Sequence, residues 1–182
     1  ALHCRLHIVH TSVPHSFELI QAARNEGLPV TGETCPHFLI CNNERWKEVG
    51  ADYKINPPLR SEENRLLLWK LLREGKIDLI ASDHAPHTPN TYPNIFDNFS
   101  GNPGVETMLP LVYSEGVNKG QIGLQDLVCL LSYNPALLLG IYPQKGVIQI
   151  GSDADIVVFD PKKKWRIEGK NLRSQSGWTM FE

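Results

Sequence analysis

One stretch constrains the fold of this chain more than any other: an apolar run over residues 77–81 that leads into Asp83, His84 and His87. A run of that length, preceded by Gly75 and a helix-like segment, is typical of a strand covered on both faces in a parallel α/β sheet. Ligands of such sheets bind at the carboxyl ends of the strands. The polar side chains after residue 81 are therefore candidate site residues.

The chemistry of this strand end has more than one interpretation. Asp83 and its histidines could supply oxygen and nitrogen ligands to a metal ion, or a general base with its neighbours. A plainer alternative is an Asp that caps the following loop, with His residues that only satisfy hydrogen bonds, since polar strand ends are common in α/β proteins. The stretch alone leaves these alternatives open.

The order of strand, polar end and helix occurs earlier in the chain as well. Residues 6–9 predict a short buried strand that ends at His10, and residues 17–25 predict a helix. Residues 29–34 predict the next strand, which runs into an irregular strand end around Pro36.

Asn56 precedes a Pro-Pro pair in an extended segment, and Ser61 is the candidate N-cap of a helix that runs to Gly75. Residues 6–83 therefore contain three strands alternating with two helices, the order of a parallel βα sheet. Three strands cannot close an eight-stranded barrel, which takes about 250 residues. The chain is either an open sheet or a piece of something larger.

The second half of the chain changes character. After a long loop at 88–103, residues 104–113 and 124–131 predict helices, and a third helix runs through Leu139. Residues 146–151 and 154–160 are rich in β-branched side chains and predict strands joined by a Gly-Ser-Asp turn. A domain boundary is expected near residues 142–143.

Composition excludes several classes of function. The 182 residues are 41% hydrophobic with a net charge of −2, which predicts a globular domain with no basic surface for nucleic acid. No apolar run approaches the roughly 20 residues that span a bilayer, so we expect a soluble protein without a membrane partner. The four cysteines form no CxxC pair and follow no secretory leader, which predicts a cytoplasmic protein.

Five motifs stand in a fixed order: Ile8-Val9-His10-Thr11-Ser12, Glu33-Thr34-Cys35-Pro36-His37, Asn56-Pro57-Pro58-Leu59-Arg60, Asp83-His84-Ala85-Pro86-His87 and Gly104-Val105-Glu106-Thr107-Met108. With residues 145–160, they resemble the C-terminal half of a dihydroorotase-like cyclic amidohydrolase of the amidohydrolase superfamily. The resemblance covers nearly the whole chain. It implies an α/β fold: the C-terminal portion of a (β/α)8 TIM-type barrel at 1–142, then strands of a small β-sandwich at 143–182.

The resemblance also implies an activity, the zinc-dependent hydrolysis of a small cyclic amide. Dihydroorotase, which converts dihydroorotate to N-carbamoyl-aspartate in pyrimidine biosynthesis, is the first candidate. Allantoinase and dihydropyrimidinase or hydantoinase are the alternatives, and the motif at residues 33–37 is closer to how allantoinases read. The motifs that begin at Asn56 and Asp83 favour dihydroorotase.

Carried over to this sequence, His10 and Asp83 would be metal ligands, and Asp83 would also be the catalytic proton shuttle. Asn56 and His87 would bind the substrate. The family usually holds two zinc ions. Metal binding lowers the pKa of water to about 7, and a carboxylate in contact with that water suits proton transfer.

The family's His-x-His pair and carboxylated Lys have no counterpart in this sequence, so the resemblance places them before Ala1. His10 and Asp83 alone make a weak site, because catalytic zinc takes three protein ligands. The second hypothesis is therefore an inactive fragment or homologue that keeps the fold without the metals. We also expect a homo-oligomer, since the strands of a partial sandwich expose an unpaired edge.

Overall fold

Three parallel strands form the centre of the chain, whose structure is a computed structural model describing residues 3–45, 50, 54–88, 92 and 94–182. The strands are β1 (Leu6–Ile8), β2 (Val30–Thr34) and β3 (Leu79–Ile80), in the order β1-β2-β3. Each is shorter than predicted, but backbone hydrogen bonds from Asp78 to Gly32 and from Ala81 to Thr34 continue the pairing on both sides of β3. The predicted parallel α/β arrangement is confirmed for these three strands.

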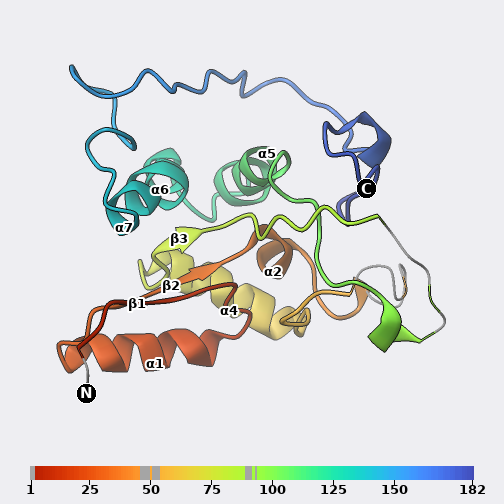
Figure 1. Cartoon of the computed structure of the whole chain (residues 1–182), viewed down its shortest axis with the longest axis horizontal. Helices are drawn as coiled ribbons and strands as arrows, with labels where there is room; N and C mark the ends of the chain where they lie inside the picture. The colour runs from red at the N-terminus through yellow and green to blue at the C-terminus, as the bar shows by residue number, and fades with distance from the viewer. Residues whose placement is uncertain (1–2, 46–49, 51–53, 89–91, 93) are drawn as a thin grey trace.

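Two twelve-residue helices connect the strands, α1 (Pro14–Asn25) and α4 (Glu62–Arg73). The first begins three residues before the predicted start, because a proline is well tolerated at the first helical position. Ser61 caps α4 as predicted: its hydroxyl accepts a hydrogen bond from the backbone N–H of Asn64 at 3.4 Å. In Figure 1, α1 runs alongside β1 and β2.

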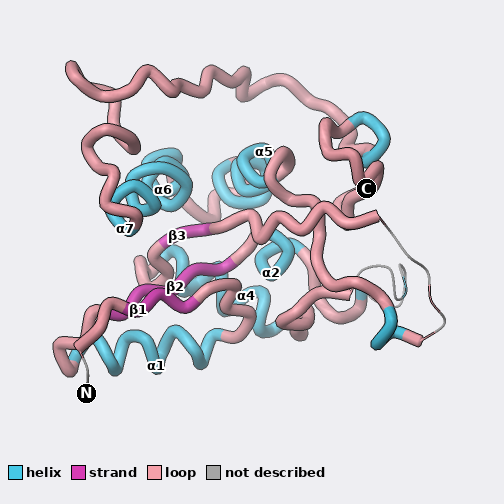
Figure 2. The backbone as a smooth tube through the Cα atoms, in the orientation of Figure 1, coloured by secondary structure: helices cyan, strands magenta, loops and turns pink. Residues whose placement is uncertain are grey.

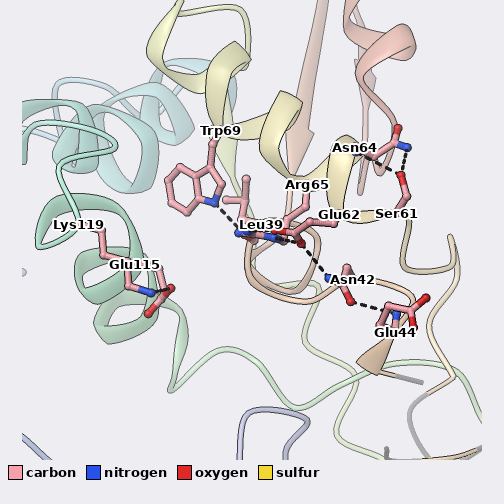
Figure 3. Close-up of polar contacts among 10 residues, drawn as sticks. All are labelled: Leu39, Asn42, Glu44, Ser61, Glu62, Asn64, Arg65, Trp69, Glu115 and Lys119. Carbon is pink, nitrogen blue, oxygen red and sulfur yellow. Dashed lines mark hydrogen bonds and ion pairs between the residues drawn. The ribbon is translucent and has the colours of Figure 1, made fainter. Parts of the chain in front are cut away.

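The segment after β2 is a short helix, α2 (Pro36–Ile40), where the sequence predicted an irregular strand end. That prediction was wrong because Pro36 stands at the start of a helix, where its missing N–H costs nothing. The backbone oxygen of Leu39 accepts hydrogen bonds from Trp69 Nε1 at 2.7 Å and Arg65 Nη1 at 3.0 Å (Figure 3). Helix α4 therefore holds α2 in place.

The hydrophobic core lies between the sheet and its helices. Its most buried large side chains include Phe17, Leu39, Leu68, Ile80 and Val112. Packing between α1 and β2 is close at Gly32, where a Cβ atom would lie 2.4 Å from Ile20 Cδ1. A side chain at that position would push α1 away from the sheet.

Beyond β3 the chain forms two helical stretches, which lie next to β3 in Figure 1. The first joins α5 (Met108–Val112) to the π-helical turn η3 (Tyr113–Val117). The second runs through α6 (Leu124–Val128), the π-helical turn η4 (Cys129–Tyr133) and α7 (Asn134–Leu138). The first was predicted from residue 104, but Gly104 instead packs against the chain that follows β3, where a Cβ would lie 2.8 Å from Ser82 O. Single turns of 3-10 helix occur at η2 (Ile95–Asp97) and η5 (Gly169–Asn171).

Residues 146–151 and 154–160 form no strands, so the two predicted strands are not seen in this chain. A strand needs a neighbour for its backbone N–H and C=O groups, and the extended chain lies alone along the upper edge of Figure 2. Its apolar side chains are exposed, with Ile150 and Val158 among the most exposed in the structure. A β-sandwich at 143–182, and the boundary near residue 142, remain predictions.

In the described part of the chain, every helix is too short or too polar to cross a membrane.

Candidate metal and substrate site

His10 and Asp83 lie just past the carboxyl ends of β1 and β3, at the same edge of the parallel sheet. Both have a left-handed backbone conformation, with φ of 40° and 46°. This region is uncommon for residues other than glycine, and strained backbone of this kind clusters at functional sites. The strand ends therefore bring together two of the predicted site residues with the conformation expected of a site.

Hydrogen bonds beyond the strands keep this edge of the sheet together. The backbone N–H of Thr11 donates to Glu33 O at 2.9 Å, and the hydroxyl of Thr34 donates to Thr11 O at 2.9 Å. The Glu33 carboxylate in turn accepts from the His10 backbone N–H at 3.4 Å and contacts His7 Nε2 at 3.0 Å. Glu33 thus orders the chain around His10, and His7, which carried no signal in the sequence, supports it.

Three potential metal-ligating side chains meet at this edge: Cys35, His37 and Asp83. One ligand atom from each lies within 4.8 Å of the other two. His37 Nε2 is 3.9 Å from Asp83 Oδ2, and His37 is fully buried. The sequence showed His37 only as part of a motif and gave it no role in the site, and the helix that carries it there was not predicted.

Several ring nitrogens at this edge are buried without a hydrogen-bond partner among the described residues. They are both nitrogens of His37 and Nδ1 of His10. Buried polar atoms are nearly always paired, so each unpaired one calls for an explanation. Imidazole nitrogens beside a carboxylate oxygen are suitable ligand atoms for a divalent metal ion such as zinc. The residues present therefore fit a metal ion.

Burial and charge set the protonation of the cluster. Burial raises the pKa of Asp83, the nearby His10 lowers it, and Glu33 raises it. Burial, with His10 as a second cause, lowers the pKa of His37 to about 3. Burial, together with Asp83 and Glu33, raises the pKa of the Cys35 thiol. At neutral pH the imidazole of His37 and the thiol of Cys35 are therefore uncharged, and Asp83 is a carboxylate of increased basicity.

The other two predicted site residues lie in a second group, on the loops that follow residues 54 and 83. Asn56 is exposed, and its Nδ2 donates to Ser100 Oγ at 2.8 Å. The ring of His87 lies 5.6 Å from that of Phe99 and 5.4 Å from that of Trp178, and its Nε2 is buried without a partner among the described residues. Among the described residues, no hydrogen bond, ion pair or ring contact joins Asn56 or His87 to His10 or Asp83. His84 is exposed and accepts a hydrogen bond from Val105 N at 3.3 Å.

Comparison with known proteins decides the family. The model of the amidohydrolase family matches residues 3–178, nearly the whole chain. The chain belongs to the amidohydrolase family.

Relatives from the amidohydrolase family have different enzyme names but similar sequence identity to this chain. The chain is 37% identical to the L-hydantoinase of Paenarthrobacter aurescens over 98% of its length and 38% identical to the dihydroorotase of Elusimicrobium minutum over 96%. It is 35% identical to an allantoinase of Escherichia coli over 93%. It spans only 40%, 40% and 37% of the lengths of these three relatives.

Solved amidohydrolase structures have the same fold as this chain. It superposes on an L-hydantoinase (dihydropyrimidinase) from Arthrobacter aurescens with a TM-score of 0.90 at 36% identity, covering 98% of this chain and 41% of the other. A D-hydantoinase gives a TM-score of 0.92 at 33% identity, over 98% and 40% of the two chains. The chain thus shares the α/β fold of these structures. Its relatives are named for different substrates, so they do not identify the substrate of this protein.

Proposed function

We propose that the protein carrying this chain hydrolyses a small cyclic amide with the help of divalent metal, with dihydroorotate as the first candidate substrate. The observation that carries the proposal is the edge of the sheet where Asp83 meets buried imidazole nitrogens that have no partner among the described residues. Such a donor set suits a metal ion, which when bound would polarise the amide carbonyl and acidify water.

Within that reaction, His10 and Asp83 would hold metal, as the sequence predicts. Asp83 would also take the proton of the attacking water and pass it to the ring nitrogen as the amide bond breaks. Its raised pKa suits the first step, because a more basic carboxylate is a better proton acceptor at neutral pH. The neutral ring of His37 lies 3.9 Å from Asp83, beyond hydrogen-bond distance, and its nitrogens, which have no partner among the described residues, would be further candidate ligands for the metal.

Asn56 and His87 would bind the substrate from the loops. Both nitrogens of neutral imidazole can hydrogen-bond, and His87 Nε2 is buried without a partner among the described residues. This ring nitrogen therefore has an unused capacity for a hydrogen bond, and its surface is covered by protein in this structure. The proposal also includes a binuclear zinc centre whose remaining ligands lie before Ala1. It further includes a homo-oligomer and a cytoplasmic location.

A hydantoin or dihydropyrimidine is the second candidate substrate, and one observation favours it. Among solved structures, the chain superposes closely on proteins named as hydantoinases and dihydropyrimidinase. These rings are cyclic amides as well, so the same carboxylate and imidazoles would serve.

The test is steady-state hydrolysis of dihydroorotate, allantoin, dihydrouracil and a 5-substituted hydantoin by the full-length protein purified with zinc. We expect the highest kcat/KM with dihydroorotate. A preference for the hydantoin would move the assignment to the second candidate. Metal-loaded protein that cleaves none of the four would contradict the enzyme proposal and favour the inactive homologue.

A further inference from the structure

The last described segment, residues 172–181, packs back onto the loop that carries His87, and we refer to it as the tail. Figure 1 shows the C-terminus beside the chain that leaves β3, although nearly a hundred residues separate them in sequence. Half of the tail's residues are buried in this position, including Trp178, Thr179 and Met180. The tail is therefore part of the packed structure at this end of the sheet.

Asn102 joins the tail to the loop after β3. Its side-chain oxygen accepts hydrogen bonds from Met180 N at 3.0 Å and from Thr179 Oγ1 at 3.4 Å. Its backbone oxygen accepts from Ala85 N at 3.0 Å, and His84 pairs with it in an isolated parallel bridge. Asn102 is only 1% exposed, so these bonds are shielded from water.

The neighbours of Asn102 leave little room for the loop to move. Gly101 lies so close to Ala85 that a Cβ atom there would be 2.3 Å from Ala85 Cβ. On the other side, a Cβ on Gly104 would be 2.8 Å from Ser82 O. The loop at 82–88 is thus in close contact with residues 101–104, and the tail is hydrogen-bonded to Asn102 within that segment.

Trp178 of the tail contacts His87 directly. Its indole Nε1 donates to the backbone oxygen of His87 at 2.7 Å, and the two rings are 5.4 Å apart. Trp178 is 8% exposed. The same His87 ring keeps a buried Nε2 without a partner among the described residues, so a fixed ring presents an unused nitrogen.

We propose that Trp178 is a positioning residue for substrate binding: it fixes the backbone and ring of His87, the residue proposed to bind the cyclic amide. This rests on the proposed function for the substrate role of His87. Among the described residues, no hydrogen bond, ion pair or ring contact joins Trp178 to Asp83 or His37, so we expect its effect to fall on binding and not on the chemical step.

The test uses Trp178→Phe in the full-length protein, which keeps an aromatic ring and removes the indole donor together with part of the ring volume. A hydrogen bond of this kind corresponds to about a 3- to 10-fold change in an equilibrium. We expect KM for the preferred cyclic amide to rise by about that factor, with kcat within about twofold of wild type. Trp69→Phe is the control for the loss of an indole donor, because Trp69 Nε1 also donates to a backbone oxygen at 2.7 Å, on Leu39. Since Trp69 also holds the helix that carries His37, the two variants are compared by KM and by hydrogen exchange, and not by kcat.

Loss of stability alone would affect both Trp variants and leave KM unchanged. A rise in KM with Trp69→Phe equal to that with Trp178→Phe would overturn the proposal. In a His87→Ala background, Trp178→Phe should cause no further rise in KM, since the residue it positions is gone. Additive effects of the two changes would also overturn it.

A readout that needs no activity separates this inference from the proposed function. We expect Trp178→Phe to speed amide hydrogen exchange in residues 84–88, while Trp69→Phe leaves that segment at the wild-type rate. Unchanged exchange in Trp178→Phe overturns the positioning role whatever the activity. Faster exchange combined with an unchanged KM in His87→Ala would instead uphold the positioning role and refute the substrate role of His87.

Discussion

Replacing Asp83 by Asn separates the chemical role of this residue from its structural one. Asp83 has φ of 46°, and Asn is among the residues that best tolerate this region, so the backbone can stay as it is. The pKa of Asp83 is raised, which means that the fold disfavours its charged form. Burial and Glu33 outweigh the favourable effect of His10 on the charge of Asp83, so we expect a neutral amide of the same shape to change the free energy of unfolding by less than about 1 kcal/mol.

Turnover should respond very differently. An amide cannot accept a proton, and losing a proton shuttle removes about 10²–10⁴-fold in rate, or roughly 3–5 kcal/mol of transition-state stabilisation. The assay is steady-state hydrolysis of the preferred cyclic amide by the full-length protein, with metal content and urea unfolding measured on the same samples. His87→Ala should lose less, about 10- to 150-fold, because it removes a substrate contact and not the shuttle.

Asp78→Asn is the matched control at the opposite end of β3. Asp78 Oδ2 accepts from Gly32 N at 2.7 Å and pairs with Arg24, and the two charged side chains are 26% and 24% exposed. Weakening a partly buried, charge-assisted contact should cost about 1–2 kcal/mol of stability and leave turnover unchanged. An Asp83→Asn protein with more than a tenth of wild-type turnover, or an Asp78→Asn protein that loses as much, would refute the assignment of Asp83.

Three further predictions concern the rest of the structure. Cys4 and Cys129 are exposed whereas Cys35 and Cys41 are buried, and burial raises the pKa of Cys41 to about 11, so iodoacetamide should modify only the first two in the native state. Mass spectrometry that finds Cys35 alkylated as fast as Cys129 would contradict this. Ser61→Ala should lower the free energy of unfolding by about 1 kcal/mol in urea titrations, because α4 loses its N-cap. His37 has a pKa of about 3 in the fold against an ordinary 6.5, so its contribution to stability is complete above pH 6.5 and is lost as the pH falls toward 3. Metal-free protein should lose about 2 kcal/mol from this group between pH 6.5 and 5, and His37→Gln should lack that loss; a variant with the same pH dependence as wild type would show that His37 is not its source.

The sequence by itself determined the parallel α/β sheet, both long helices and the polar strand ends. Apolar runs, the Ser61 cap and the glycines that end helices act over a few residues, so a local pattern is enough to predict them. The same local pattern put His10 and Asp83 after their strands, and parallel pairing then had to bring both to one edge.

Only the tertiary structure decided which side chains join them there. His37 enters the cluster because residues 36–40 form a helix that Trp69 and Arg65 hold from α4, contacts that span 26 to 30 positions of sequence. The link from Trp178 to His87 spans 91 positions, and no local pattern predicts it. The strands predicted at 146–160 show the reverse case, because their sequence favours extended chain but a ladder forms only when a neighbouring strand supplies its hydrogen bonds.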